Sequence, residues 1–562
     1  MRRPKSRGGR WDVLLLLAVL LSCSVRPAGL AGLPGAPQLG AAPRASGAAA
    51  LPGDSENIRW ADHFPGSDLG AQINAADSDL GKERGEIRVG RPGTVETRVT
   101  LTANHVLRLL APTTWQAGIQ AQSGTSVLGN GCASLLTLVF RLPASFITAS
   151  NMANIKVADL CAEAALRSNR NILLTVSAAQ GIELTGCRTA NIRLGEFNNS
   201  SDVKVIGNTA TAERNDPSTG TAVSFSFTHD ALAAHNTIRG FAHGLQWWGG
   251  DANPKKGGAA ANPRGARRLS FVGNSISDVG GGGIWGSMGE GIAATGNVIE
   301  NCGDVCLDSE GSNSVVFSNN YVKDGANGAI TTFYYNRDVL ITGNTVVSSS
   351  AAKPLLRTYT TGQDQPFDRD VQVVGNHFAC LDASPCFINS VAGLPERFIF
   401  KDNALRNVAL DLSAANPKHF VLVSGNDFLF DVPSPKPLGA ISVAHTNALG
   451  RGVAGDCEIS NNTVRSNVRQ PARSAAIWVL QDDPAIAPLT LIEGNHLLGL
   501  YPFPIDIAVG GASKNPSVTP LFLIRNNLMG AGALSRLDQS NPRSNVKLEG
   551  NYRSDSAPFL SQ

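Results

Sequence analysis

The feature that most constrains the fold of this chain is a short repeat. An apolar strand ends in Gly-Asn, or a near variant, and another short strand follows. The repeat carries Asn274, Asn297, Asn320, Asn344, Asn376, Asn403, Asn426, Asn462, Asn495, Asn527 and Asn551, with weaker copies at Asn208 and Asn236. The closest copies are 23 and 24 residues apart, and the spacing widens to between 27 and 38 where loops are inserted. About 23 residues hold three short strands and three turns, whereas helical repeats need roughly 33 or more. The repeat therefore predicts one long solenoid in place of the three or four domains that 562 residues would otherwise suggest.

The turn asparagines have a structural explanation. In a stack of parallel coils, each strand pairs with its counterparts ~4.8 Å above and below. An Asn at the same turn of every coil can bond to the next Asn and so satisfy its buried amide. We predict that these residues form a ladder and are not ligands.

The segment before the repeats supports a capped solenoid. In "FPGSDLGAQINAADSDLGKERGEIRVG", Leu69, Ile73, Ala76 and Leu80 lie on one face of an expected short helix, and a strand at 86–89 follows. Such a helix would cover the open edge of the first coil. With the Gly-Asn coils, this segment resembles right-handed parallel β-helix proteins of the pectate-lyase-like superfamily. The resemblance implies an all-β chain: a single-stranded right-handed parallel β-helix over residues 58–562 with a short N-terminal capping helix. It does not select an activity, because the superfamily includes lyases, hydrolases, epimerases and adhesins.

The N-terminus is typical of an export signal. Five basic residues precede nine apolar residues at 13–21, too few to span a bilayer, which takes roughly 20. We therefore expect a signal peptide at 1–23 and an Ala/Gly/Pro-rich linker at 24–57. Leu20-Leu-Ser-Cys23 also resembles a lipoprotein box, so a lipid anchor at Cys23 is the alternative to free secretion. Both predict a secreted, periplasmic or cell-surface location, with an outer-membrane lipoprotein as one form, and no transmembrane segment.

The charge excludes one class of partner. The formal net charge is +3, but the leader contributes five bases and one acid, so the rest of the chain is near −1. A basic surface for nucleic acid is not expected. A polysaccharide is the expected partner, and the protein is expected to be a monomer.

Counting from each turn Asn predicts which side chains stack on the outer surface. Alternation along 305–310 directs Val305, Leu307 and Ser309 inward and Asp308 and Glu310 outward. Eleven residues after the turn Asn, successive coils carry Trp285, Asp308, Thr331 and Leu355. Thirteen residues after it they carry Ser287, Glu310, Phe333 and Arg357, and fifteen residues after it Gly289, Ser312, Tyr335 and Tyr359. Trp247 and Trp248 would extend this surface toward the N-terminus.

Aromatic platforms beside hydrogen-bonding groups are complementary to sugar rings. Cleavage of a glycosidic bond needs two carboxylates, and outward groups two residues apart on a strand could supply the wider spacing of inverting enzymes. We therefore expect a polysaccharide hydrolase without a required cofactor. Its catalytic residues would be Asp308 and Glu310, assisted by Arg357 and Tyr359, with Trp247, Trp285, Phe333 and Tyr335 binding substrate. If both carboxylates face solvent, neutralising either should change stability by under about 1 kcal/mol.

Two alternatives stay open. Asp304, Asp308 and Glu310 could instead bind Ca²⁺ through oxygen. Arg357 or Tyr359 would then abstract a proton beside a uronate carboxyl group, as in calcium-dependent polysaccharide lyases of this fold, which this arrangement resembles. A non-catalytic glycan-binding or adhesive solenoid would need the aromatic residues but not the acids.

The spacing of four cysteines suggests disulfides between residues close together in the sequence. Cys302 and Cys306 flank one turn, and Cys380 and Cys386 flank another. Disulfides are plausible there if the Cα atoms approach within about 7 Å; buried free thiols are the alternative.

Overall fold

The computed structural model describes residues 57–553 apart from 141–143, 166–170, 214–219, 253–264, 360–367, 392–393, 413–419, 446–455, 482–488, 510–520 and 531–544. The expected signal peptide at 1–23, the lipid-anchor cysteine Cys23 and the expected linker up to residue 56 lie outside the described residues. From Ser55 onward the chain forms one compact unit.

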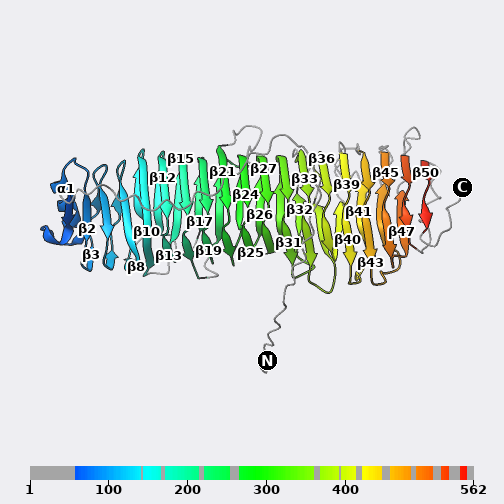
Figure 1. Ribbon diagram of the computed structural model, residues 1–562, viewed down its shortest axis with the longest axis horizontal. Coiled ribbons are helices and arrows are strands. Elements are labelled where there is room, and N and C mark those ends of the chain that lie inside the picture. The colour runs from blue at the N-terminus through cyan, green and yellow to red at the C-terminus, as the bar shows by residue number, and fades with distance from the viewer. Residues whose placement is uncertain are drawn as a thin grey trace, which may run out of the picture. The chain divides into compact units, whose positions relative to one another are not determined.

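The unit is a stack of parallel coils, in which strands follow one another along the stack in chain order (Figure 1). One coil contains β24 (Gly289–Thr295), β25 (Val298–Cys302) and β26 (Val305–Glu310). The next repeats this order with β27 (Asn313–Ser318), β28 (Tyr321–Gly325) and β29 (Gly328–Phe333), and each strand pairs in parallel with its counterpart. This arrangement confirms the predicted single-stranded parallel β-helix.

Two sheets result from this pairing. The first strands of the coils pair with one another, and so do the second strands, and together they make up a 35-stranded sheet. Two long strands near the N-terminal end, β8 (Ser126–Leu138) and β10 (Ala153–Ala164), pair with both sets of strands and so join them. The third strands form a separate 16-stranded sheet: β4 (Val99–Thr100), β7 (Ile119–Gln120), β9 (Ser145–Ser150), β11 (Ile172–Ser177), β14 (Arg193–Asn198), β17 (Thr221–Ser226), β20 (His243–Trp248), β23 (Ile284–Ser287), β26, β29, β32 (Leu356–Tyr359), β35 (Cys386–Val391), β38 (Val408–Leu412), β41 (Gly439–His445), β44 (Ala475–Gln481) and β47 (Phe503–Val509).

The first coil is preceded by the expected helix, α1 (Leu69–Leu80). Asp68 caps it by accepting hydrogen bonds from the backbone N–H groups of Gly70 and Ala71. Its predicted apolar face is buried in the same core that runs through the coils. Burial of that face is what attaches α1 to the first coils, because most of its other residues are only partly buried or exposed.

The asparagine ladder is present as predicted, and the two weaker copies belong to it. Each side-chain amide donates to the carboxamide oxygen of the next Asn at 2.9–3.0 Å, from Asn208 through to Asn551. Asn297 illustrates the complete pattern. Its Nδ2 donates to Asn320 Oδ1 and to the carbonyl of Phe271, and its Oδ1 accepts from the amide and backbone N–H of Asn274. The ladder therefore satisfies polar groups that the stacked coils have buried.

The two expected disulfides form, and a third one joins neighbouring coils. Cys302 pairs with Cys306 and Cys380 with Cys386, with Cα atoms 5.4 and 5.5 Å apart. The third pair, Cys132 with Cys161, is 29 residues apart in sequence and was not foreseen. Among the described cysteines, Cys187 and Cys457 are free and buried.

We predict that Asn297→Ala lowers the free energy of unfolding by about 1–3 kcal/mol. The substitution leaves buried donors and acceptors of Asn274, Asn320 and Phe271 without their partner. Urea unfolding measures the effect. Asn130→Ala is the control, since the Asn130 side chain is exposed, and an equal loss in both variants would contradict the ladder's role.

Alkylation of the unfolded, unreduced protein should modify Cys187 and Cys457. Cys132, Cys161, Cys302, Cys306, Cys380 and Cys386 should react only after reduction, because their sulfurs are paired. Peptide mapping by mass spectrometry reads out each site. Free thiols at Cys302 and Cys306 before reduction would contradict the pairing beside Asp304.

Candidate active site

The outer surface of the 16-stranded sheet carries two adjacent columns of side chains, defined by the strand register. The carboxylate column runs through Gln246, Trp285, Asp308, Thr331, Arg357 and Asn389; the aromatic column runs through Trp248, Ser287, Glu310, Phe333 and Tyr359. As expected, Asp308 and Glu310 are neighbours on the outer surface of one strand, and Trp285 lies one strand away from Asp308.

The register corrects the predicted placement of Arg357 and Tyr359. Counting thirteen residues from Asn344 put Arg357 level with Glu310, but it pairs with Thr331 and so belongs to the column of Asp308. Tyr359 pairs with Phe333 and belongs to the column of Glu310. The coil after Asn344 has two more residues before its third strand than the preceding coil has, so a fixed count assigns Arg357 to the wrong column. Leu355, which the count put outward, is fully buried.

The predicted outward position of Trp247 is wrong. Its side chain is fully buried and its ring lies 5.8 Å from that of Phe271 in the core. The coil after Asn236 is one residue shorter than the next before its third strand, and a shift by one residue reverses the face on which a side chain lies. Trp248 instead occupies the outer surface, in the column of Glu310.

Tyr335 is not on the strand either. It lies in the turn after β29 with φ near 59°, and burial raises the pKa of its partly buried hydroxyl. The neighbouring aromatic cluster contains a residue that sequence counting missed. The ring of Tyr334 lies 5.8 Å from Phe333 and 6.4 Å from Tyr359. Phe333 and Tyr359 are themselves 5.1 Å apart, so three rings lie together beside Glu310.

Asp308 points outward but is not exposed, in contrast to the expectation of solvent-facing carboxylates. Its side chain is 5% exposed and its Oδ1 has no hydrogen-bond partner. Loss of hydration raises the pKa of Asp308 well above its usual range, and the nearby charges of Glu310 and Asp304 raise it further. Burial and the neighbouring negative charges therefore both favour the protonated form of Asp308.

Glu310 titrates close to neutrality. Burial raises the pKa of its carboxyl group to about 7, and the negative charges of Asp251 and Asp304 act in the same direction. Both neighbouring carboxyl groups thus have raised pKa values, and the pKa of Glu310 lies in the range that general acid–base catalysis at neutral pH requires.

His243 is a further polar residue at this site that the sequence pattern did not identify. Its Nδ1 accepts a hydrogen bond of 2.8 Å from the N–H of Gly282, and its ring lies 5.0 Å from Trp285. Burial lowers the pKa of His243, partly offset by the charge of Asp304. Because Nδ1 accepts, the neutral ring carries its proton on Nε2. Only the fold reveals this residue, since β20 and β23 are separated in sequence by the insertion at 253–264.

Arg357 is held by two amides on the same surface. Its Nη1 donates to Asn327 Oδ1 at 2.5 Å, and its Nε donates to Asn389 Oδ1 at 3.3 Å. Partial burial lowers the pKa of Arg357. Neutral amides fix the guanidinium without neutralising it, so it is positioned to bind an anionic or hydroxyl oxygen.

The residues expected for calcium do not form a ligand set in the described part of the chain. Asp304 is exposed in the disulfide-closed turn before β26, whereas Asp308 is buried on the strand. No group of three or more His, Cys, Asp or Glu side chains within the described residues is placed to hold a metal ion.

We predict that Glu310→Gln gains stability relative to the natural chain as pH rises. In the folded state Glu310 keeps its proton up to about pH 7, whereas the unfolded chain loses it near its ordinary pKa of 4.5. Between these values the folded state binds more protons, so stability falls as pH rises. Gln removes this loss, and the variant should gain roughly 1–3 kcal/mol on going from pH 4 to pH 8.

Asp308→Asn should behave in the same direction, because its pKa is also raised by burial. Urea unfolding at the two pH values measures both variants. Asp202→Asn, at an exposed carboxylate of the 35-stranded sheet, is the control and should show no such gain. A gain at pH 4 rather than pH 8 would contradict the raised pKa values.

Comparison with known proteins supports the fold. Residues 171–378 match the family described as the right handed beta helix region. No curated protein matches the chain. The fold is thus a right-handed parallel β-helix, as the resemblance implied.

Solved structures with this architecture include three that are 12–13% identical to the chain. The catalytic unit of a GH87 α-1,3-glucanase from Streptomyces thermodiastaticus is 12% identical to this chain, with a TM-score of 0.33; the match spans 91% of this chain and 73% of the glucanase chain. The mannuronan C-5 epimerase AlgE4 A-module from Azotobacter vinelandii is 13% identical, with coverages of 89% and 100% and a TM-score of 0.30. The tailspike protein of E. coli bacteriophage HK620, in complex with a hexasaccharide, is 13% identical, with coverages of 78% and 75% and a TM-score of 0.35. At these identities the likeness concerns the fold alone.

Proposed function

We propose that the protein is an exported enzyme that hydrolyses glycosidic bonds of a polysaccharide on the outer surface of its 16-stranded sheet. The observation that carries the proposal is the pair Asp308 and Glu310: two carboxyl groups on one strand, both with pKa values raised mainly by burial, beside a cluster of aromatic rings. A pair in which one group holds a proton and the other can lose it is what glycoside hydrolysis needs.

The two carboxyl groups have different roles in this mechanism. Asp308, whose raised pKa favours its protonated form, is the general acid that protonates the glycosidic oxygen as the bond to the anomeric carbon breaks. Glu310 is the general base that removes a proton from the attacking water. Residues i and i+2 on a strand are about 6.5–7 Å apart at Cα, which favours the inverting spacing.

The remaining residues bind the sugar chain. Trp285 lies one strand from Asp308, and Phe333 and Tyr359 follow Glu310 on the next two strands. Their rings offer apolar faces to successive sugars. Arg357, held by Asn327 and Asn389, donates to sugar oxygens on the same surface.

Elimination is the second candidate, because burial lowers the pKa of Arg357 and so brings this side chain closer to acting as a base. In that reaction Arg357 or Tyr359 would take the proton beside a uronate carboxyl group. Hydrolysis is preferred, since Asp304, Asp308 and Glu310 form no calcium ligand set among the described residues, and the raised pKa of Asp308 favours its protonated form, which is a poor calcium ligand.

The proposal places the enzyme outside the cytoplasm, freely secreted or anchored through Cys23, acting as a monomer on its polysaccharide. None of the helices within the described ranges is long and apolar enough to cross a membrane. The signal-type leader is the feature that supports export.

We predict that Asp308→Asn and Glu310→Gln each lower the rate of polysaccharide cleavage by roughly 10²–10⁴-fold, because each removes one proton-transfer group. The assay measures reducing ends and the ultraviolet absorbance of unsaturated uronate products over a panel of polysaccharides. Asp202→Asn should keep full activity. Reducing ends without the absorbance support hydrolysis; the absorbance supports elimination; full turnover in both site variants would contradict the site.

The pH profile of kcat/KM should distinguish the two carboxyl groups. Activity should rise as Glu310 ionises around pH 7 and fall at higher pH as Asp308 loses its proton. Activity that is highest at pH 4–5 would contradict the assigned roles, since Glu310 is protonated there.

A further inference from the structure

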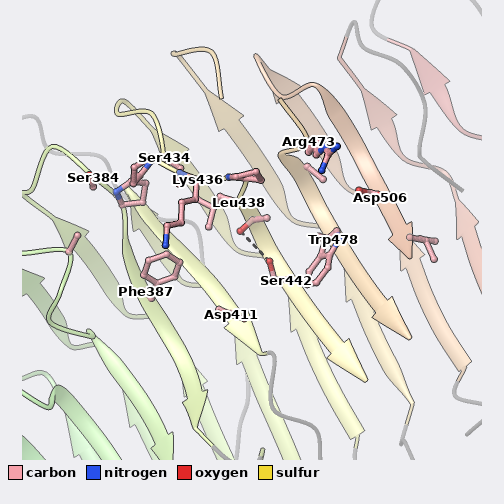
Figure 2. Close-up of a pocket in the computed structure, with 17 residues that line it drawn as sticks. Ser384, Phe387, Asp411, Ser434, Lys436, Leu438, Ser442, Arg473, Trp478 and Asp506 are labelled. Atoms are coloured by element: carbon pink, nitrogen blue, oxygen red, sulfur yellow. Dashed lines mark hydrogen bonds between the residues drawn. The ribbon is translucent and has the colours of Figure 1, made fainter. Parts of the chain in front are cut away.

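A cavity of about 1020 Å³ lies on the 16-stranded sheet, away from Asp308 and Glu310. Its floor is formed by the continuation of the carboxylate column, which passes from Asn389 through Asp411, Ser442, Trp478 and Asp506. The loop at 434–438 forms part of its wall and carries Lys436 (Figure 2). The cavity is therefore built from the same outer surface as the candidate active site.

The floor repeats the central feature of that site. Trp478 on β44 pairs with Asp506 on β47, just as Trp285 on β23 lies level with Asp308 on β26. The matching side chains are alike in environment: both tryptophans are partly buried, and Asp506 and Asp308 are 8% and 5% exposed. An indole beside a buried carboxyl group thus occurs twice in one column.

The second carboxyl group of the pair is not repeated. Two residues after Asp308 the chain has Glu310, but two residues after Asp506 it has Ala508, which carries no ionisable group. Hydrolysis of a glycosidic bond requires two carboxyl groups close together. Asp411, the other carboxyl group of the floor, lies three strand steps of ~4.8 Å from Asp506, or roughly 14 Å along the column. The cavity therefore has the features of a sugar-binding site without those of a hydrolytic one.

We propose that this cavity is a separate binding site for a neutral oligosaccharide, which it holds without cleaving it. Trp478 provides the platform for a sugar face, while Asp411, Ser442 and Asp506 accept hydrogen bonds from hydroxyl groups. Exposed Lys436 and Arg473 lie at the cavity and donate to sugar oxygens. A neutral sugar is favoured because the two acids and the two bases of the lining, Asp411, Asp506, Lys436 and Arg473, leave it with no formal net charge to select an anion.

The two sites are too far apart to share one sugar. Six strand steps of ~4.8 Å separate Asp308 from Trp478, or roughly 29 Å along the column. A polysaccharide that follows the column can occupy both, so the cavity would anchor a chain whose distant part reaches Asp308. Binding at the cavity does not depend on cleavage, and the two proposals can fail separately.

Affinity gel electrophoresis of the full chain tests the site, with laminarin, dextran and galactomannan as neutral probes and polygalacturonate as the anionic probe. It is run on the Asp308→Asn variant, so that no probe is cleaved. At least one neutral probe should retard this protein, and Trp478→Ala in the same background should weaken that retardation about tenfold or more in Kd. Trp285→Ala is the matched control and should retain the retardation that depends on the cavity.

Trp478→Phe keeps an aromatic ring, so its Kd for the probe should lie between the Kd of the parent and that of Trp478→Ala. This variant separates loss of the platform from loss of folding. Far-UV circular dichroism establishes that each variant is folded. The proposal is overturned if no neutral probe retards the protein, if only polygalacturonate does, or if Trp478→Ala binds as tightly as its parent. If Asp308→Asn abolishes cleavage but keeps the retardation, and adding Trp478→Ala removes the retardation, both proposals are supported. If Asp308→Asn cleaves as fast as the natural chain while adding Trp478→Ala still removes the retardation, only the proposed catalytic pair is refuted.

Discussion

The parallel register between successive coils is the constraint on which the rest of the structure depends. It brings every equivalent turn to the same place, so the turn Asn of one coil can satisfy that of the next. It also aligns the side chains of equivalent strands into columns. A coil that gains or loses residues must absorb them in its turns, because a one-residue slip within a strand would turn its core side chains outward.

The same register explains how carboxyl groups become buried on an outer surface. Asp308 points away from the core, yet Trp285 lies level with it on one neighbouring strand and Thr331 on the other. Neighbours ~4.8 Å away on both sides exclude water from a short side chain. Raised pKa values at Asp308 and Glu310 follow from this position, and they reduce stability at high pH. Such a cost is typical of groups retained for function.

The sequence predicted the elements that depend on local pattern. The turn asparagines, the buried face of α1 and the two disulfides within coils all follow from short-range spacing. Two of the predictions that failed depended on a constant coil length. The coil after Asn236 has one residue fewer before its third strand, which places Trp247 in the core, and the coil after Asn344 has two more, which places Arg357 in the column of Asp308. Cys132–Cys161 and the approach of His243 to Trp285 join different coils, so no local spacing could reveal them.

A solenoid also permits a surface feature to recur without any repeat in sequence. Trp285 with Asp308, and Trp478 with Asp506, have different neighbours in the chain, and only the strand register shows that they are equivalent. In the two proposals, a linear polymer extends along the same axis as these columns, so each recurrence adds a contact to a single ligand. Linked contacts raise affinity more than either contact alone, provided that one chain can span both. The proposals then assign to one carboxyl group, Glu310, the difference between a position that cleaves the polymer and one that only holds it.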